Sequence, residues 1–167
     1  DAKFSLEDPI FLEIFKKWTF PLSDFQKWAI YSIYKGHDTL VCAPTGSGKT
    51  LPAEFAIEYY HKLGKKIIYT TPIKALSNEK FYTLSKKFPN ISFGLLTGDN
   101  KFNPEADVVI MTTEILLNTL KKMKTIKTNN TTNVLLDFEI NIETELGTVI
   151  FDEIHYINDA NRGYVWE

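Results

Sequence analysis

The stretch VCAPTGSGKTLPAEFAIEYY, residues 41–60, places a glycine-rich loop between an apolar segment and an amphipathic one. A phosphate chain carries dense negative charge, and backbone N–H groups can surround it only where no side chain blocks their approach. Gly46 and Gly48 give that freedom, Lys49 can reach the β- and γ-phosphates, and the Thr50 hydroxyl can ligate magnesium. The helix expected next directs its N-terminal dipole at the same anion. The stretch therefore predicts a nucleotide-binding phosphate loop.

Two features bear on the strength of that prediction. Ala43 stands where the consensus phosphate loop has glycine, so the loop is a close variant. The alternative is an incidental glycine-rich turn, which the apolar run before the loop and the helical pattern after it disfavour.

Apolar runs rich in β-branched residues recur along the chain and predict buried strands. They lie at 39–44, 65–72, 91–98, 107–113 and 147–153. Helical patterns separate most of them, which is typical of βαβ units with right-handed crossovers. The predicted fold is a three-layer α/β domain with a mainly parallel sheet and helices on both faces.

Capping residues mark the helix boundaries. Asp8 and Pro9 predict an N-cap and a first helical position for a helix over 10–18. Ser23 is expected to cap a second helix that Gly36 ends, and Gly64 is expected to end the helix after the loop.

The segment 121–133 interrupts this alternation, since it is polar and lacks apolar periodicity. We interpret it as a mobile surface loop inside an inserted polar segment, 121–146. The alternation of Phe138, Ile140 and Ile142 favours a short edge strand or hairpin.

Asp152 and Glu153 follow the last apolar run, in VIFDEIHYI. At a strand end beside a phosphate loop, one carboxylate can hold the metal and the next can orient or deprotonate the attacking water. An acidic strand cap is the alternative, and the joint presence of the phosphate loop favours catalysis. His155 taken alone is more typical of a packing residue.

Composition limits the remaining possibilities. A net charge of −2 and a pI near 6.0 provide no general basic surface for nucleic acid. Cys42 is the only cysteine, which excludes an internal disulfide, suits a reducing compartment and suggests a buried thiol. No segment has the length and hydropathy of a membrane helix, and no segment has the charged, apolar and small-residue pattern that marks a signal peptide. We expect an intracellular protein, nuclear or cytoplasmic.

Taken together, the motifs resemble the first RecA-like domain of the superkiller-type DExH-box RNA helicases of superfamily two, which feed RNA to the exosome. The resemblance covers about residues 20–167, with residues 1–19 as an N-terminal helical flank. The motifs are FPLSDFQ (20–26), APTGSGKT (43–50), TPIKALSNEK (71–80), LTGD (96–99), VIMTTEIL (109–116), VIFDEIHYI (149–157) and RGYVWE (162–167).

The resemblance implies a RecA-like P-loop NTPase fold and ATP with Mg²⁺ as cofactors. It assigns adenine stacking to Phe20, a hydrogen bond at the adenine edge to Gln26, and a link toward a second RecA-like domain to His155. It also implies that Asp152 binds magnesium together with Thr50 and that Glu153 positions water. The residues that it places on the phosphates are Thr45, Gly46, Ser47, Gly48, Lys49 and Thr50.

The same resemblance implies contacts with single-stranded RNA where predicted strands end. These residues are Pro72, Lys74, Ala75, Thr97, Gly98, Asp99, Thr112, Thr113 and Glu114. Backbone amides and hydroxyls there suit phosphates and the 2′-hydroxyl. An alternative for Thr112 or Thr113 is that it caps the helix EILLNTLKKM, and both roles can coexist.

We therefore expect a fragment of an ATP-dependent RNA helicase that hydrolyses ATP when it is joined to a second RecA-like domain. Exosome-type RNA decay factors are the expected partners, and no membrane is involved. The fragment by itself is expected to be nearly inactive, because the family supplies an arginine finger from the second domain. Two alternatives stay open: a DNA-directed repair helicase of superfamily two, and a scaffold that only binds nucleotide.

Overall fold

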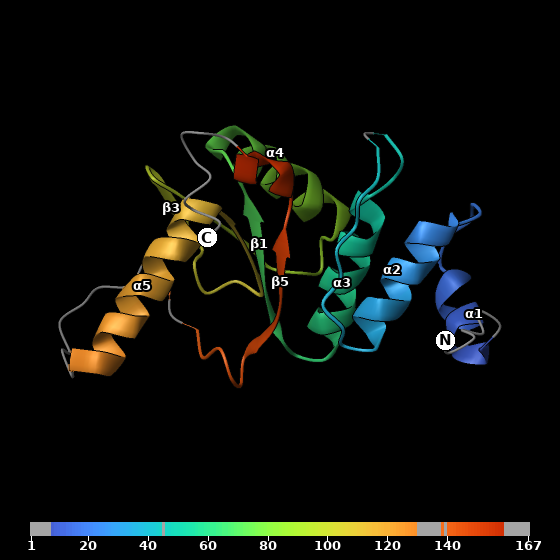
Figure 1. Cartoon of the computed structure of the whole chain (residues 1–167), viewed down its shortest axis with the longest axis horizontal. Helices are drawn as coiled ribbons and strands as arrows, with labels where there is room; N and C mark the ends of the chain where they lie inside the picture. The colour runs from blue at the N-terminus through green and yellow to red at the C-terminus, as the bar shows by residue number, and fades with distance from the viewer. Residues whose placement is uncertain (1–7, 45, 130–137, 139, 159–167) are drawn as a thin grey trace. The chain divides into compact units, whose positions relative to one another are not determined.

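The computed structural model describes residues 8–44, 46–129, 138 and 140–158 (Figure 1). The chain divides into two compact units, residues 1–59 and residues 60–167. The first unit is helical, and the second contains all strands of the sheet.

The first unit contains α1 (Pro9–Phe15), α2 (Asp24–Tyr34) and most of α3 (Thr50–Lys62). The predicted cap of α1 is confirmed, since the Asp8 carboxylate accepts a hydrogen bond of 3.0 Å from the Ile10 N–H. The helix ends at Phe15 and continues only as turns to Trp18, so it is shorter than the predicted 10–18. Gly36 and Gly64, with φ of +75° and +69°, follow α2 and α3 as predicted.

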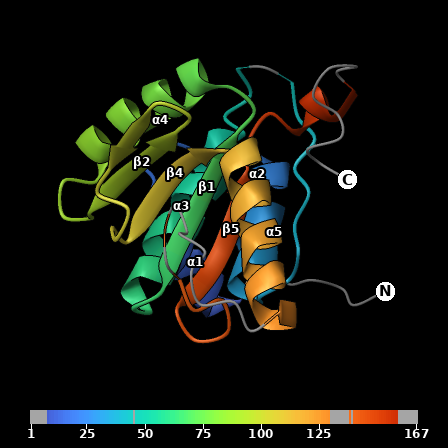
Figure 2. The same ribbon diagram turned by 90° about the vertical axis from the view of Figure 1, so that its left-hand side faces the viewer.

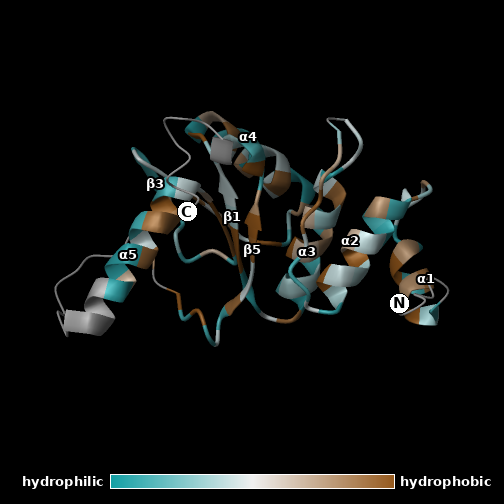
Figure 3. Cartoon of the chain, viewed as in Figure 1, coloured by the Kyte–Doolittle hydropathy of each residue, from teal (hydrophilic) through white to brown (hydrophobic). Residues whose placement is uncertain are grey.

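Aromatic side chains build the core of this unit. Phe11 of α1 is fully buried, and its ring lies 4.6 Å from that of Tyr31, centroid to centroid. A second cluster joins α2 and α3 through Leu22, Ile30, Leu51 and Phe55. The ribbon of α2 contains both hydrophobic and hydrophilic residues (Figure 3), as expected of a helix with one buried side.

The predicted strand at 39–44 is not formed. Residues 39–44 are all described, and none of the sheet's ladders includes them. Leu40 is 71% exposed, and Cys42, which we expected to be buried, is exposed as well. An apolar run becomes a strand only when a neighbouring strand pairs its backbone N–H and C=O groups, and the described residues of the first unit contain no strand that could do so.

The second unit contains a five-stranded sheet in the order β3-β2-β4-β1-β5. The strands are β1 (Lys66–Thr71), β2 (Phe93–Thr97), β3 (Asn100–Phe102), β4 (Val108–Thr112) and β5 (Leu146–Phe151). All neighbouring pairs are parallel except β2 and β3, which form an antiparallel hairpin. The mainly parallel sheet is confirmed, with strands at four of the five predicted runs.

Helices lie on both faces of this sheet, which completes the predicted three layers (Figure 2). The helix α4 (Lys74–Lys87) follows β1 and packs on β1, β2 and β4. The helix α5 (Thr113–Asn129) follows β4 and packs on β4 and β1. A short 3₁₀ helix, η1 (Ile154–Asn158), follows β5.

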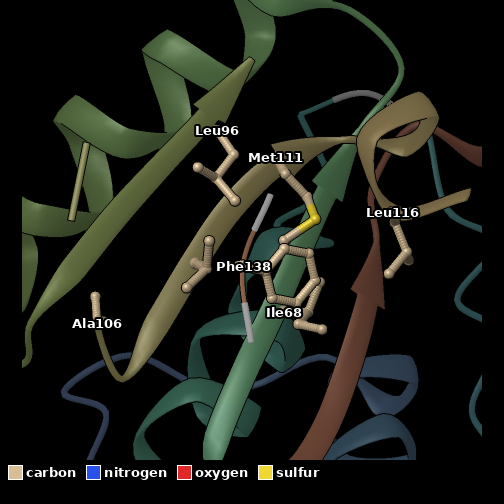
Figure 4. Close-up of a cluster of buried hydrophobic side chains, with 7 residues drawn as sticks. Ile68, Leu96, Ala106, Met111, Leu116 and Phe138 are labelled. Atoms are coloured by element: carbon tan, nitrogen blue, oxygen red, sulfur yellow. The ribbon is translucent and has the colours of Figure 1, made fainter. Parts of the chain in front are cut away.

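The core beneath α5 is apolar and includes a residue from the segment that follows this helix. Phe138, only 4% exposed, packs beside Ile68 and Met111 (Figure 4). Ile68, Leu96, Val109 and Met111 point to the same face because alternate residues of a strand do so. The segment after α5 thus contributes to the core.

Two predictions about residues 121–146 are wrong. The predicted loop at 121–133 is helical through Asn129, and 130–133 lie outside the described residues. No glycine or proline interrupts the sequence between Thr113 and Asn129, and lysine and methionine are good helix formers, so the helix continues without apolar periodicity.

The predicted edge strand or hairpin around residues 138–142 is also wrong where it is described. The Asn141 Oδ1 accepts hydrogen bonds of 3.1 Å from the N–H groups of Glu143 and Thr144. A backbone hydrogen bond of 2.8 Å from Glu145 N to the Asn141 oxygen closes the turn. Local side-chain hydrogen bonds of this kind compete with strand pairing.

Candidate functional site

The glycine-rich loop folds as a tight turn that leads into α3. The Ser47 N–H and its hydroxyl both donate to the Pro44 carbonyl oxygen, at 3.2 and 2.6 Å. Gly46 and Gly48 both have φ of +81°, a left-handed conformation that side chains other than glycine rarely adopt. The helix begins at Thr50, directly after Lys49. The glycines are therefore needed for the shape of this turn.

Gln26 holds the loop from α2. Its side-chain Nε2 donates to the Gly48 carbonyl oxygen at 3.1 Å, and its Oε1 accepts from the Ser23 N–H at 2.9 Å. The side chain is 6% exposed, so both ends of the amide are used inside the unit. A Cβ on Gly48 would lie 2.6 Å from the Gln26 Nε2, closer than real contacts allow. Sequence reasoning missed this contact.

The remaining predicted nucleotide contacts of this unit differ in accessibility. Phe20 is 51% exposed, which leaves ring surface available for stacking, whereas Lys49 and Thr50 are half-buried. Thr45 lies outside the described residues. The adenine roles of Phe20 and Gln26 stay predictions.

The acidic pair lies directly beyond β5, as predicted. The Asp152 N–H continues the ladder by donating to the Thr70 carbonyl oxygen at 2.9 Å, and the Glu153 N–H donates to the Asp152 Oδ1 at 3.0 Å. Glu153 has φ of +57°, one of two left-handed residues other than glycine in the described part of the chain. This conformation costs free energy in residues other than glycine, and residues strained in this way are found preferentially at functional sites.

His155 lies beside Glu153. Its Nδ1 is 3.1 Å from the Glu153 Oε2, and its side chain is 66% exposed. The Glu153 carboxylate thus has an imidazole nitrogen within hydrogen-bonding distance.

The predicted RNA contacts gather at the carboxyl edge of the sheet. Leu96, Met111, Thr70 and Phe151 form one row across β2, β4, β1 and β5. The next residue of each strand lies at the carboxyl edge of the sheet. Thr97, Thr112 and Asp152 are three of these residues. The structure therefore brings the three predicted RNA segments and the acidic pair to one edge, where open α/β sheets bind ligands.

The side chains at this edge divide into exposed and buried sets. Exposed positions are Lys74, Ala75, Gly98 and Asp99, whereas Pro72, Thr97, Thr112 and Thr113 are buried and Glu114 is half-buried. Two of the buried hydroxyls have internal acceptors. Thr97 donates to the Asp99 Oδ1 at 3.2 Å, and Thr113 donates to the Thr71 carbonyl oxygen at 3.2 Å.

Lys74 and Asp99 form an ion pair between the start of α4 and the β2–β3 turn. The hydrogen bond from Lys74 holds the pKa of the Asp99 carboxyl below its ordinary value of 3.8, and the Thr97 hydroxyl acts in the same direction. Two of the three predicted RNA segments are thus tied together before any ligand binds.

Asp152 has two further partners that no motif predicts. The Tyr69 hydroxyl donates to the Asp152 Oδ2 at 2.8 Å, and the Lys80 Nζ lies 3.1 Å from the same oxygen. Tyr69 belongs to an apolar strand run and Lys80 to a polar helix face, so neither shows a local signal of this contact. Only the pairing of β1 with β5 brings them together.

Comparison with known proteins identifies the family. The DEAD/DEAH box helicase family matches residues 23–167, which is most of the chain. The chain belongs to this family.

Similar helicases come from several kingdoms. Antiviral helicase SKI2 of Saccharomyces cerevisiae is 43% identical over 91% of this chain and 11% of its own length. Superkiller complex protein 2 of Homo sapiens is 44% identical over 90% of this chain and 11% of its own length. The probable helicase HelY of Mycobacterium tuberculosis is 42% identical over 89% of this chain and 15% of its own length. The chain therefore spans only a small part of the relatives it matches, and the resemblance to the superkiller type is confirmed.

Solved structures support the fold. The DUF1998 helicase MrfA bound to DNA and AMPPNP matches with a TM-score of 0.56 at 22% identity, covering 66% of this chain and 17% of that one. This likeness confirms the RecA-like α/β fold of the helicase domain.

Membership in this family implies use of a nucleotide with Mg²⁺. In the first unit, Thr50 offers a hydroxyl oxygen, and in the second unit, Asp152 offers carboxylate oxygens; each is a kind of oxygen donor that Mg²⁺ accepts. Within the described residues, no group of three or more His, Cys, Asp or Glu side chains could hold a metal ion. Across the described part of the chain, every helix is too short or too polar to cross a bilayer.

Proposed function

We propose that this chain is the nucleotide-binding part of an ATP-dependent RNA helicase that binds ATP–Mg²⁺ and single-stranded RNA. One observation carries the proposal: the acidic pair Asp152–Glu153 and the three predicted RNA segments follow strands of one sheet at the same edge. In a helicase, the bound nucleotide changes the affinity for RNA. This coupling requires that the ATP site and the RNA site share structural elements that move together.

In this proposal the loop at 46–50 binds the phosphates, with Lys49 neutralising charge and the Thr50 hydroxyl and Asp152 serving Mg²⁺. The bound Mg²⁺ supplies charge neutralisation at the β- and γ-phosphates. Glu153 orients the attacking water and accepts its proton, and His155 supports the Glu153 carboxylate at 3.1 Å. Exposed Phe20 stacks on adenine, while Gln26 supports the loop and presents its remaining hydrogen-bonding capacity to the base.

RNA is the proposed nucleic acid because the names of two relatives refer to RNA. These are the DExH-box ATP-dependent RNA helicase DExH15 of Arabidopsis thaliana, 40% identical over 93% of this chain, and mRNA transport homolog 4 of Caenorhabditis elegans, 41% identical over 91%. We also propose a role in RNA processing or decay beside exosome-type factors, in the nucleus or cytoplasm, as the resemblance of the sequence motifs to the superkiller type implies.

Hydrolysis requires a second RecA-like domain in this proposal. The opposing domain supplies an arginine that stabilises the transition state, and such residues are worth about 10³–10⁵ in rate. The 167-residue chain should therefore bind ATP–Mg²⁺ weakly and hydrolyse it negligibly.

The test compares ATP turnover by the 167-residue chain with turnover by the natural protein, which in this proposal joins the chain to a second RecA-like domain. Each protein is assayed with RNA and with DNA of matched sequence. We expect RNA-stimulated turnover in the natural protein alone. Equal stimulated rates in both would refute the two-domain mechanism, and stimulation by DNA but not RNA would identify a DNA helicase instead.

A further inference from the structure

Both carboxylate oxygens of Asp152 have partners, which are the neighbouring backbone N–H group and side chains from β1 and α4. Its Oδ1 accepts from the Glu153 N–H at 3.0 Å, and its Oδ2 receives the Tyr69 hydroxyl at 2.8 Å and the Lys80 ammonium at 3.1 Å. The side chains of Asp152 and Lys80 are only 17% and 20% exposed. A charge-assisted contact that is largely removed from water is stronger than a surface ion pair.

The two side-chain partners differ in how freely they can move. Tyr69 is 1% exposed and lies in β1, between β4 and β5, so its hydroxyl is a fixed donor. Lys80 reaches Asp152 from α4, through a flexible four-carbon stem that carries a compact charge. Of these two contacts, therefore, only the one from Lys80 depends on the position of α4.

The start of α4 is also an RNA segment in the proposed function. Lys74, its first residue, pairs with Asp99 of the β2–β3 turn. Lys80 lies six residues further along, about 9 Å along a helix that rises 1.5 Å per residue. One rigid helix thus carries a cation at the RNA edge and the cation that contacts Asp152.

Buried hydrogen bonds join this helix to the neighbouring elements. The hydroxyls of Ser77 and Thr71 lie 2.7 Å apart, and both residues are fully buried. The Thr71 carbonyl oxygen accepts from the Thr113 hydroxyl at the start of α5, and the preceding Thr70 carbonyl accepts from the Asp152 N–H. A shift of α4 relative to β1 must therefore break buried contacts or move with them.

From these contacts we infer that Lys80 is a positioning residue that couples RNA binding to the nucleotide site through the Asp152 carboxylate. The inference rests on the proposed function, in which Asp152 serves ATP–Mg²⁺. RNA bound at the start of α4 changes the distance from Lys80 to Asp152, and so the negative charge that Asp152 offers to the metal. Tyr69 keeps the carboxylate oriented in both states.

The experiment measures, in the natural protein, how strongly the binding of RNA and the binding of Mg²⁺–AMPPNP affect each other. The dissociation constant of single-stranded RNA is measured with and without Mg²⁺–AMPPNP, and that of Mg²⁺–AMPPNP with and without RNA. The two ratios must agree, because coupling between two ligands is reciprocal. RNA-stimulated ATP turnover is recorded in parallel.

Lys80→Met should reduce both ratios to within about twofold of unity, while Mg²⁺–AMPPNP binds to the RNA-free protein as tightly as before or more tightly. Lys80→Arg, which keeps the charge, should restore most of the coupling. Tyr69→Phe should weaken Mg²⁺–AMPPNP binding equally with and without RNA, so its ratio stays at the wild-type value. Lys86→Met is the matched control, since Lys86 lies on the same helix but contacts Tyr82.

Wild-type ratios in a folded Lys80→Met protein would overturn the inference, and so would equal losses in Lys80→Met and Lys86→Met. If Tyr69→Phe also brought the ratios of dissociation constants to unity, Lys80 and Tyr69 would not have separate roles, and the inference would be overturned. A wild-type protein that binds neither Mg²⁺–AMPPNP nor RNA would refute the proposed function and the inference with it. Binding without Lys80 dependence refutes the inference alone.

Discussion

Gly48 is the position where one added methyl group tests the loop most directly. Gly48→Ala forces an alanine into φ of +81° and places its Cβ 2.6 Å from the Gln26 Nε2. The left-handed conformation costs an L-residue about 1–2 kcal/mol. Displacing Gln26 from the Gly48 carbonyl removes a further hydrogen bond, worth about 0.5–1.5 kcal/mol net.

The sum predicts that Gly48→Ala lowers the free energy of unfolding by about 1.5–3.5 kcal/mol. Gly46→Ala is the matched control, because Gly46 has the same φ of +81° but open space around its Cβ. It should cost only the conformational part, about 1–2 kcal/mol. Denaturant unfolding of the two variants measures the difference, with the slope m checked for constancy.

A double-mutant cycle with Gln26→Ala isolates the contact. When the Gln26 side chain is absent, Gly48→Ala should cost no more than Gly46→Ala. Equal costs for the two glycine variants in the presence of Gln26 would refute the argument, because the contact between α2 and the loop would then contribute nothing.

Three further predictions concern the site itself. Lys49→Ala should leave the fold intact and lower ATP turnover of the natural protein by about a hundredfold or more, since one preorganised donor is worth about 10²–10³; unchanged turnover would refute the phosphate-loop assignment. Glu153→Gln should still bind ATP but lose about 10²–10⁴ in hydrolysis, as expected of a general base, and failure to bind ATP would contradict that role. The Asp99 carboxyl should titrate below 3.8, and Lys74→Ala should raise its pKa toward that value. NMR titration checks this; the ion pair's stabilisation is present above pH 3.8 and is lost as pH falls through the lowered pKa.

The sequence pattern predicted the sheet well because β1, β2 and β4 are buried on both faces, and the half-buried edge strand β5 is apolar as well. Continuous apolar runs are typical of such strands, and the runs at 65–72, 91–98, 107–113 and 147–153 contain β1, β2, β4 and β5. The run at 39–44 has the same character, but the described part of its own unit contains no strand to pair with it, and pairing cannot be read from composition. Apolar character therefore predicts a strand only where the fold supplies a partner.

The errors after β4 have a different physical origin. Loss of apolar periodicity at 121–133 favours a loop, but helix propensity and cooperativity extend α5 through Asn129. At 140–145 the pattern of alternation was outweighed by one asparagine whose side chain binds the backbone twice. Both cases show local chemistry that a periodicity argument omits.

Motifs predicted which elements form the edge, but not which of their groups face outward. Thr97, Thr112 and Thr113 are at most 7% exposed, so their side chains stabilise the edge. The exposed positions at this edge include Gly98 and Ala75, which have no polar side chain, and Lys74, whose charge is paired with Asp99. An edge of this kind presents mainly backbone groups to a ligand. Backbone groups recognise phosphate and sugar and not base edges, so the proposed RNA binding is expected to show no sequence preference.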